Sequence, residues 1–214
     1  MIYFFVLILT LHLQGNELNL PKNEYDITSN LKLEITDKNY LLDFETFDQN
    51  GDVHVVVEIP TGTIDKWEVR KSDGALVWKK KNGFPRVVNY IGYPGNYGMI
   101  PKTMFSKGIG GDGDPLDAII LGPPVSRGSV VSVKVIGLME MIDTGEADHK
   151  LICVAKDTHF YQLNSMDDLM ENYPGVLRIL KVWFSNYKGQ GFVSEIQIKS
   201  AASAMDLLDN VMLN

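Results

Sequence analysis

Cysteine and positive charge are both scarce in this chain. Its 214 residues contain one cysteine, Cys153, which excludes an internal disulfide framework and a thiolate metal cluster. The neighbours of Cys153 in LICVA indicate a small core residue. The 20 Lys and Arg residues are outnumbered by 27 Asp and Glu, which gives a net charge of -7. Because such a surface repels polyanions, we expect no nucleic-acid partner, and an anionic substrate must be held by local cations or bound metal.

Long apolar runs are absent apart from one at the N-terminus. Residues 2–11, IYFFVLILTL, are extended by His12 and Leu13. A membrane span needs about 20 apolar residues, so residues 1–15 fit a signal peptide better, and we expect export to the periplasm or the medium. No Lys or Arg precedes the run, and LQG at 13–15 only loosely resembles a cleavage site. An uncleaved anchor, giving membrane contact through this segment alone, or a cytoplasmic protein are the alternatives.

Period-two patterns predict strands through the middle of the chain. Residues 16–50 are a polar lead-in, with a possible strand near Leu31 to Ile35. In VHVVVEI at 53–59, alternate residues from Val53 to Ile59 share one face, which leaves His54, Val56 and Glu58 on the other. KWEVR at 66–70 and ALVWK at 75–79 flank an SDG turn, as in a hairpin.

Further strands are expected at 117–121, 129–137 and 150–155, between loops rich in Gly, Pro and Asp. Short strands without intervening helices indicate an antiparallel barrel or sandwich. Helices are predicted late: a short one capped by Ser165, one after Pro174, and an amphipathic one from about Ser200 to Leu213. The second has apolar residues at helical spacing, namely Val176, Ile179, Leu180, Trp183 and Tyr187.

The segment GDGDPLDAIIL at 111–121 places Asp112, Asp114 and Asp117 within six positions at the start of a predicted core strand. Pro115 stiffens the loop, which fixes the carboxylates relative to one another. Oxygen ligands without nearby His or Cys suit Mg²⁺, Mn²⁺ or Ca²⁺ rather than zinc. A calcium EF-hand is excluded by its register, because Asp117 stands where that loop needs Gly. Magnesium is the leading candidate.

Magnesium is usually completed by substrate phosphate, so a magnesium site predicts groups that grip phosphate. Each such group alone also fits a structural role; the prediction rests on acidic, basic and phenolic side chains alternating along one chain. They are Lys66 with Glu68, Arg86, Tyr93 and Tyr97 in YPGNYG, Asp143 and Asp148 with Lys150, and Tyr187 with Lys188.

The hexapeptide DGDPLD at 112–117 resembles the signature of the soluble metal-dependent inorganic pyrophosphatases, the β-barrel family. In the order of that family follow VEIP at 57–60, KWE at 66–68, YPGNYG at 93–98, DxxxxDxK at 143–150 and NYK at 186–188. The resemblance runs from about Val53 to Lys188. It implies a mainly β or α+β fold: a small closed OB-like barrel of five strands flanked by helices, occupying residues 51–214.

The resemblance also implies Mg²⁺-dependent hydrolysis of inorganic diphosphate to two orthophosphates by a metal-bridging water, with Mn²⁺ or Co²⁺ as possible substitutes, in a homo-oligomer. It assigns the metals to Asp112, Asp117 and Asp148, with Asp143 and Glu58 for additional ions. It assigns proton removal to Asp114, and support to Tyr93 and Glu68. It assigns the phosphates to Lys66, an arginine, Tyr97, Lys150, Tyr187 and Lys188.

One stretch departs from the family pattern. KKKNGFPRVVNYIGY, between the hairpin and Tyr93, is longer than expected. Arg86 is the preferred candidate for the family's arginine because a guanidinium can bind phosphate bidentately; Lys80 and Lys81 remain alternatives. His149 alternates with Asp148 and Lys150, so we expect it to face away. A nucleoside polyphosphate hydrolase and a nonenzymatic OB-like binding module are the alternative functions, and the acidic balance opposes the second.

Overall fold

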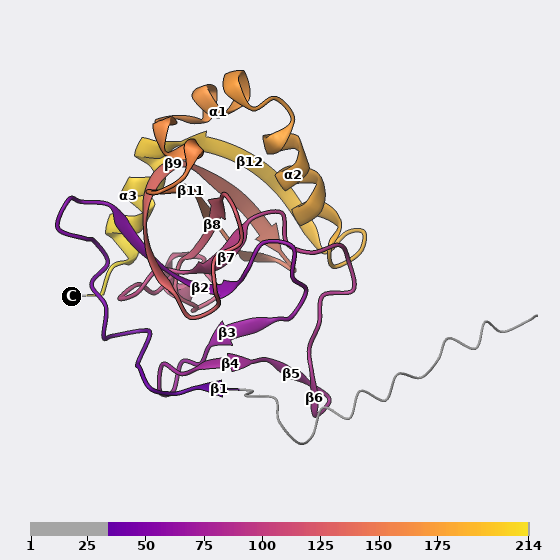
Figure 1. Cartoon of the computed structure of the whole chain (residues 1–214). Coiled ribbons are helices and arrows are strands. Elements are labelled where there is room, and N and C mark those ends of the chain that lie inside the picture. Colours follow the sequence, from indigo (N-terminus) through magenta and orange to yellow (C-terminus); the bar gives the residue numbers. More distant parts are fainter. Residues whose placement is uncertain (1–33, 214) are drawn as a thin grey trace, which may run out of the picture. The chain divides into compact units, whose positions relative to one another are not determined.

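The computed structural model of this chain describes residues 34–213, so the predicted signal segment and most of the polar lead-in lie outside the described residues. Within that range, five strands close into a ring (Figure 1). In ring order they are β9 (Val130–Asp143), β11 (Lys150–Ala155), β8 (Asp117–Leu121), β7 (Asn96–Met99) and β2 (Val53–Ile59), which pairs back onto β9. The closed five-stranded barrel that the resemblance implied is confirmed.

One pair of ring strands corrects the antiparallel expectation. Strands β8 and β11 are parallel, with Lys150 opposite Asp117 in the register. The chain reaches β11 only after passing through β9, and such a crossover connection brings a later strand back in the same direction. The parallel register places the N-terminal ends of β8 and β11, both beside acidic loops, next to each other.

The remaining strands extend or flank the ring. β10 (Glu146–Ala147) and β12 (Val193–Ser200) both pair with β9. A separate sheet has the order β1 (Glu34–Ile35), β4 (Leu76–Trp78), β3 (Trp67–Val69), and β5 (Lys80–Lys81) pairs with β6 (Phe84–Pro85) in a hairpin. Short 3₁₀ turns lie at η1 (Lys107–Ile109) and η2 (His159–Gln162). The alternating segment that forms β12 was not predicted from the sequence.

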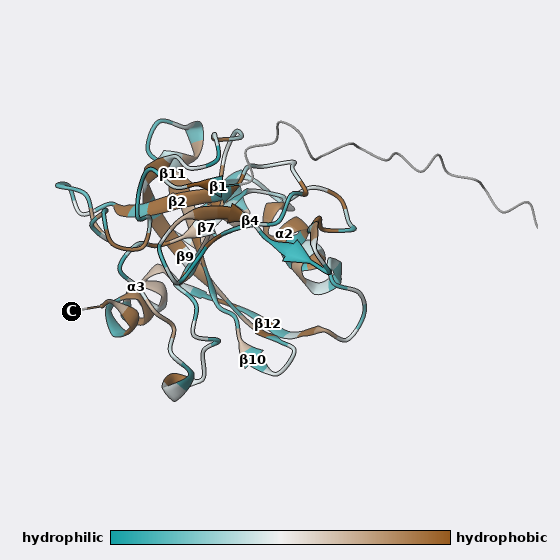
Figure 2. Cartoon of the chain, turned by 90° about the horizontal axis from the view of Figure 1, so that it is seen from below, coloured by the Kyte–Doolittle hydropathy of each residue, from teal (hydrophilic) through white to brown (hydrophobic). Residues whose placement is uncertain are grey.

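Strand β2 is buried on both faces, which corrects the one-sided alternation expected from its sequence. Val53, Val55 and Val57 pack inside the barrel, whereas Val56 packs against the outer three-stranded sheet with Trp67. Figure 2, coloured by hydropathy, shows the hydrophobic character of β2 and its neighbour β7. Because the outer sheet covers this side, Glu58 is also buried.

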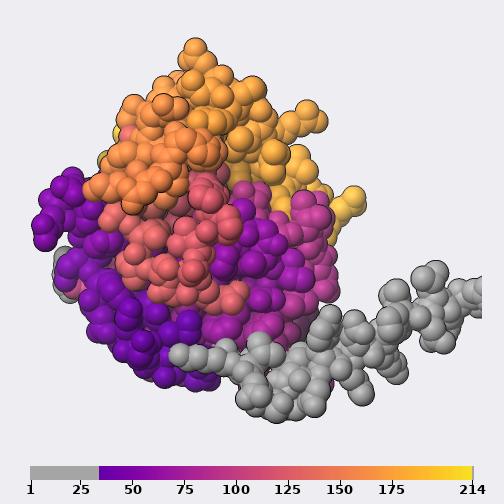
Figure 3. Space-filling view, in the orientation of Figure 1, coloured from indigo at the N-terminus to yellow at the C-terminus, as the bar shows by residue number. Residues whose placement is uncertain are grey.

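Helices cover the barrel late in the chain, as predicted. α1 (Met166–Asn172) is capped by Ser165, whose Oγ accepts the Asp168 N–H at 3.1 Å. α2 (Val176–Asn186) and α3 (Ala201–Val211) follow, and in the space-filling view α1 and α2 form the orange surface above the ring (Figure 3).

The inner face of α2 buries Leu180, Trp183 and Phe184. Ile179, which the sequence places on the apolar face of α2, is 58% exposed, so the buried face of the helix is narrower than the sequence indicates. None of the helices within residues 34–213 combines the length and hydrophobicity that a bilayer crossing requires.

Candidate active site

A cavity of about 450 Å³ opens between the ring and the outer sheet, and charged side chains dominate its lining. Strands β2, β3 and β7, the loop before β8, the ends of β9 and α2, and the segment before β11 all contribute. The acidic members are Glu58, Glu68, Asp112, Asp114, Asp117, Asp143 and Asp148. The basic members are Lys66, Arg70, Lys71, Lys79, Arg86 and Lys188. Residues far apart in the sequence therefore meet in one polar pocket.

The aspartate loop is held rigidly against the barrel. Asp112 Oδ1 accepts the Asp114 N–H at 2.9 Å, which closes a tight turn. The Phe105 N–H donates to the Asp114 carbonyl, and the Gly113 N–H donates back to the Phe105 carbonyl, both at 2.8 Å. Burial, with the neighbouring Asp114, Asp117 and Asp148 adding to it, raises the pKa of Asp112 to about 6. Asp112 therefore holds its charge reluctantly without a cation beside it.

Lys150 supplies a cation that contacts two of these acids. Its side chain is 0% exposed, and Nζ lies 2.9 Å from Asp117 Oδ2 and 2.7 Å from Asp148 Oδ1. Burial would lower the pKa of Lys150, but Asp117 and Asp148 raise it well above its usual range. Burial raises the pKa of Asp117 despite Lys150, whereas the lysines around Asp148 overcome burial and lower its pKa.

The two tyrosines of YPGNYG differ in position: Tyr97 lines the cavity and Tyr93 does not. The Tyr97 hydroxyl hydrogen-bonds Asp117 Oδ2, and the Lys66 ammonium lies 4.9 Å from the centre of the Tyr97 ring. Tyr93 is buried and is not part of the lining; its ring lies 5.2 Å from that of Tyr97 and 4.4 Å from that of Trp183. Tyr93 therefore packs behind Tyr97.

Glu58 is a buried acid at the inner end of the pocket. It is 5% exposed, and its Oε1 accepts the Val69 N–H at 2.7 Å. Burial raises the pKa of Glu58 to about 8, although the nearby Lys66 opposes that shift. Near neutral pH this carboxyl therefore carries a proton in much of the population.

Other acids of the lining pair with lysines. Lys188 contacts Asp143, Lys71 contacts Asp114, and Lys79 Nζ lies 2.6 Å from Glu68 Oε2. Tyr187 is also in the lining, as the sequence predicted, and Arg86 reaches it too. Lys80 and Lys81, the alternatives to Arg86, are exposed on the hairpin and are not in the lining. His149 is also not in the lining; its Nδ1 accepts the Met141 N–H at 3.3 Å, and its ring packs on Phe105.

The sequence profile of inorganic pyrophosphatases matches residues 55–213, which include every acidic and basic residue of this lining. The chain belongs to the inorganic pyrophosphatase family. Inorganic pyrophosphatase 1 of Caenorhabditis elegans is 37% identical over 150 residues, 63% of this chain and 35% of that protein. The enzyme of Gluconobacter oxydans is 41% identical over 128 residues, 58% of this chain and 68% of that protein.

Structural similarity agrees with the sequence. The crystal structure of type I inorganic pyrophosphatase from Toxoplasma gondii has a TM-score of 0.75 and 29% identity, covering 81% of this chain and 85% of that one. The chain spans well under two thirds of the length of some curated pyrophosphatases, the worm protein among them.

Pyrophosphatases of this family are metal-dependent, and the donor set of the pocket fits a hard divalent cation. The charged oxygen donors of the lining are carboxylates, and it contains no His or Cys. Burial, with neighbouring carboxylates adding to it, raises the pKa of Asp112 and Asp117. Among the described residues, no three acidic, imidazole or thiol side chains are already grouped closely enough to hold one ion. The Lys150 ammonium lies between Asp117 and Asp148 instead.

Sequence reasoning missed three cations of the lining, namely Arg70, Lys71 and Lys79. Arg70 and Lys71 lie in the turn between β3 and β4, where polar residues are ordinary. Lys79 is the last residue of the second strand of the predicted hairpin. Its only signal in the sequence is that it follows Trp78, so the two side chains should point to opposite faces of the strand.

Proposed function

We propose that this chain catalyses the metal-dependent hydrolysis of inorganic diphosphate to two orthophosphates, with Mg²⁺ as the metal and Mn²⁺ or Co²⁺ as substitutes. One observation carries the proposal: acidic, basic and phenolic side chains from widely separated segments surround one cavity, in a chain of the pyrophosphatase family. Diphosphate is a compact polyanion, and such an alternation of charge suits a metal–diphosphate complex.

We assign the most tightly held ion to Asp112, Asp117 and Asp148, and additional ions to Asp143 and Glu58. When bound, divalent cations lower the pKa of a water to about 7 and neutralise phosphoryl oxygens. Glu58 must lose its proton to act as a ligand; because burial raises its pKa to about 8, the carboxylate is favoured at alkaline pH or by a cation beside it. Asp114, on the rigid loop beside these ligands, accepts the proton of the attacking water.

The phosphoryl oxygens are held by Lys66, Arg86, Tyr97, Lys150, Tyr187 and Lys188. Burial raises the pKa of Tyr97 and of Tyr187, so both hydroxyls stay protonated and donate hydrogen bonds at neutral pH. Tyr93 supports Tyr97 through its ring contact, and Glu68 orients the neighbouring cations. Together these donors stabilise the charge that builds on the leaving phosphate.

Phosphate release from diphosphate and from ATP, each with Mg²⁺ and with excess chelator, tests the proposal. We expect fast release from diphosphate that requires Mg²⁺, and slow release from ATP. Faster release from ATP would favour a nucleoside polyphosphate hydrolase. Release from neither would leave a nonenzymatic binding module and contradict the proposal.

We also propose that the chain forms a homo-oligomer, which rests on the family resemblance. Sedimentation equilibrium at micromolar concentration measures the assembly mass directly. A mass equal to that of one chain would contradict this assignment.

A further inference from the structure

Three cationic residues are tied side by side by their own backbones at the wall of the cavity. The Lys66 N–H donates to the Arg86 carbonyl at 3.0 Å, and the Lys79 N–H donates to the Lys66 carbonyl at 2.9 Å. The Arg86 N–H donates to the Lys79 carbonyl at 2.7 Å. These bonds form a closed cycle, so the spacing of the three side chains is set by main-chain structure.

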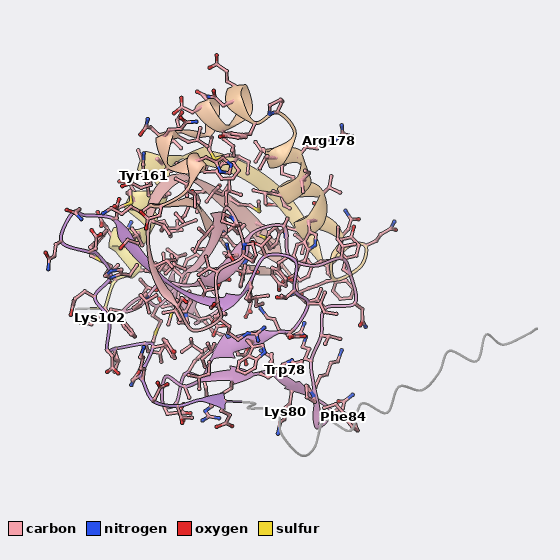
Figure 4. The ribbon with its side chains drawn as sticks, viewed as in Figure 1. Trp78, Lys80, Phe84, Lys102, Tyr161 and Arg178 are labelled. Atoms are coloured by element: carbon pink, nitrogen blue, oxygen red, sulfur yellow. The ribbon has the colours of Figure 1, made fainter. Side chains whose placement is uncertain are left out.

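The β5–β6 hairpin makes this cycle possible. Asn82 and Gly83 at its tip have φ of 54° and 84°, as a tight two-residue hairpin turn requires. The turn returns the chain so that Arg86 lies beside Lys79. In Figure 4, Lys80 and Phe84 lie farther from the barrel than Trp78. Lys79 and Arg86, at the base of the hairpin, line the cavity.

The positive charges of these three neighbouring side chains repel one another, and a bound polyanion would offset that repulsion. The side chains of Lys66, Lys79 and Arg86 all line the cavity. In the described structure the Lys79 ammonium rests on Glu68, in a pair whose side chains are 40% and 36% exposed. An ion pair this open to solvent contributes little net stability, so the ammonium can leave it for a more highly charged partner.

We infer that Lys79 is a further substrate-holding residue, whose ammonium transfers from Glu68 to a phosphoryl group when diphosphate binds. This inference rests on the proposed function. Lys79 would then be a third cation beside Lys66 and Arg86, and the backbone cycle holds all three in place.

The test compares Lys79→Gln with Lys80→Gln, a neighbouring exposed lysine that is not in the lining, and with Lys79→Arg. Calorimetric titration with methylenediphosphonate, a non-hydrolysable diphosphate, in Mg²⁺ measures affinity independently of turnover. We expect Lys79→Gln to weaken binding about tenfold or more, Lys79→Arg to retain most of it, and Lys80→Gln to match the parent chain. Steady-state kinetics should show the loss chiefly in KM.

Equal affinity of Lys79→Gln and Lys80→Gln for the diphosphonate would overturn the inference. A tenfold loss in Lys79→Arg as well would also overturn it, because a retained cation should still hold phosphate. If the parent chain binds the diphosphonate but releases no phosphate from diphosphate, the hydrolysis proposal fails while the titration still decides the role of Lys79. If the parent chain neither binds the diphosphonate nor releases phosphate from diphosphate, both fall.

Discussion

Lys150 Nζ lies 2.9 Å from Asp117 Oδ2, across the parallel register that joins β11 to β8. The same ammonium, fully buried, also donates to Asp148. Lys150→Met should therefore leave two carboxylates that are mostly removed from solvent, 20% and 16% exposed, without their cation and lower the free energy of unfolding by about 3–5 kcal/mol in urea titrations. Lys199→Met, which breaks the more exposed pair with Glu140, should cost no more than about 1 kcal/mol. Similar losses in the two variants would contradict the central position of Lys150.

Metal addition provides a second measurement on Lys150→Met. Without the ammonium, Asp117 and Asp148 should bind a divalent cation in its place, because two carboxylates so close otherwise repel. Saturating Mg²⁺ should raise the Tm of the variant more than that of the parent chain. An equal or smaller increase would show that the two acids do not share an ion.

Asp117→Asn should remove most turnover while leaving the chain folded. The amide keeps the size of the side chain but removes a charge from the proposed metal ligands, so phosphate release should fall by roughly 100-fold or more. Lys150 keeps Asp148 as a partner, so the loss of stability should be smaller than in Lys150→Met. Asp209→Asn, on the exposed side of α3, is the control and should be fully active. Unchanged turnover in Asp117→Asn would contradict the metal assignment.

Local patterns were sufficient to predict the two strands that begin at or beside Asp117 and Asp148, whereas β9 continues past its predicted end at residue 137 to Asp143. The strands 117–121 and 150–155 were predicted at the bounds that β8 and β11 have, because each is a short apolar run beside a polar loop. The common direction of Asp148 and Lys150 followed from their spacing of two, and their 2.7 Å contact agrees with it.

Long-range packing explains what could not be predicted. Val56 and Glu58 occupy the polar face of an alternating strand, yet they are buried because the distant β3–β4 sheet covers them. The parallel pairing of β8 with β11 depends on a crossover that no window of sequence reveals. Lys79 reaches the cavity because a hairpin returns Arg86 to its side, which is a relationship between residues seven apart.

Gly98 should tolerate no side chain. It lies on β7 opposite Val57, and a Cβ at this position would be 1.9 Å from the Val56 carbonyl oxygen. Gly98→Ala must therefore push β7 away from β2, and we expect a loss of about 1–3 kcal/mol or more in urea titrations. Gly108→Ala is the matched control, because its nearest neighbour would be Ser106 Oγ at 3.8 Å. Equal stability of the two variants would contradict this close approach.

Export predicts a shortened N-terminus. We propose that residues 1–15, whose apolar run is short for a membrane span, act as a signal segment that is removed on export, so protein recovered outside the cytoplasm should begin near residue 16. N-terminal sequencing of protein from each cell fraction measures this. Leu7→Arg places a charge within the run and should retain the protein in the cytoplasm. An intact N-terminus on cytoplasmic protein alone would contradict export.

Asp48 should make stability depend on pH at acidic values. Its side chain is 14% exposed, and its Oδ1 accepts the N–H groups of Asn50 at 2.7 Å and Asp52 at 3.0 Å. Burial would raise the pKa of Asp48, but these hydrogen bonds, with Ser132 and Lys156 nearby, lower it to about 2.

In the unfolded chain the pKa of an aspartate is about 3.9. Because the folded pKa is the lower one, the stabilisation by Asp48 is complete above the unfolded pKa and is lost as the pH falls towards 2. Asp48→Asn should therefore have a Tm a few degrees below that of the parent chain at pH 7, with the gap narrowing from about pH 4 downwards. Thermal unfolding at intervals from pH 7 to pH 3 measures the gap. A gap that stays constant over this range would mean that Asp48 does not stabilise the loop through its charge.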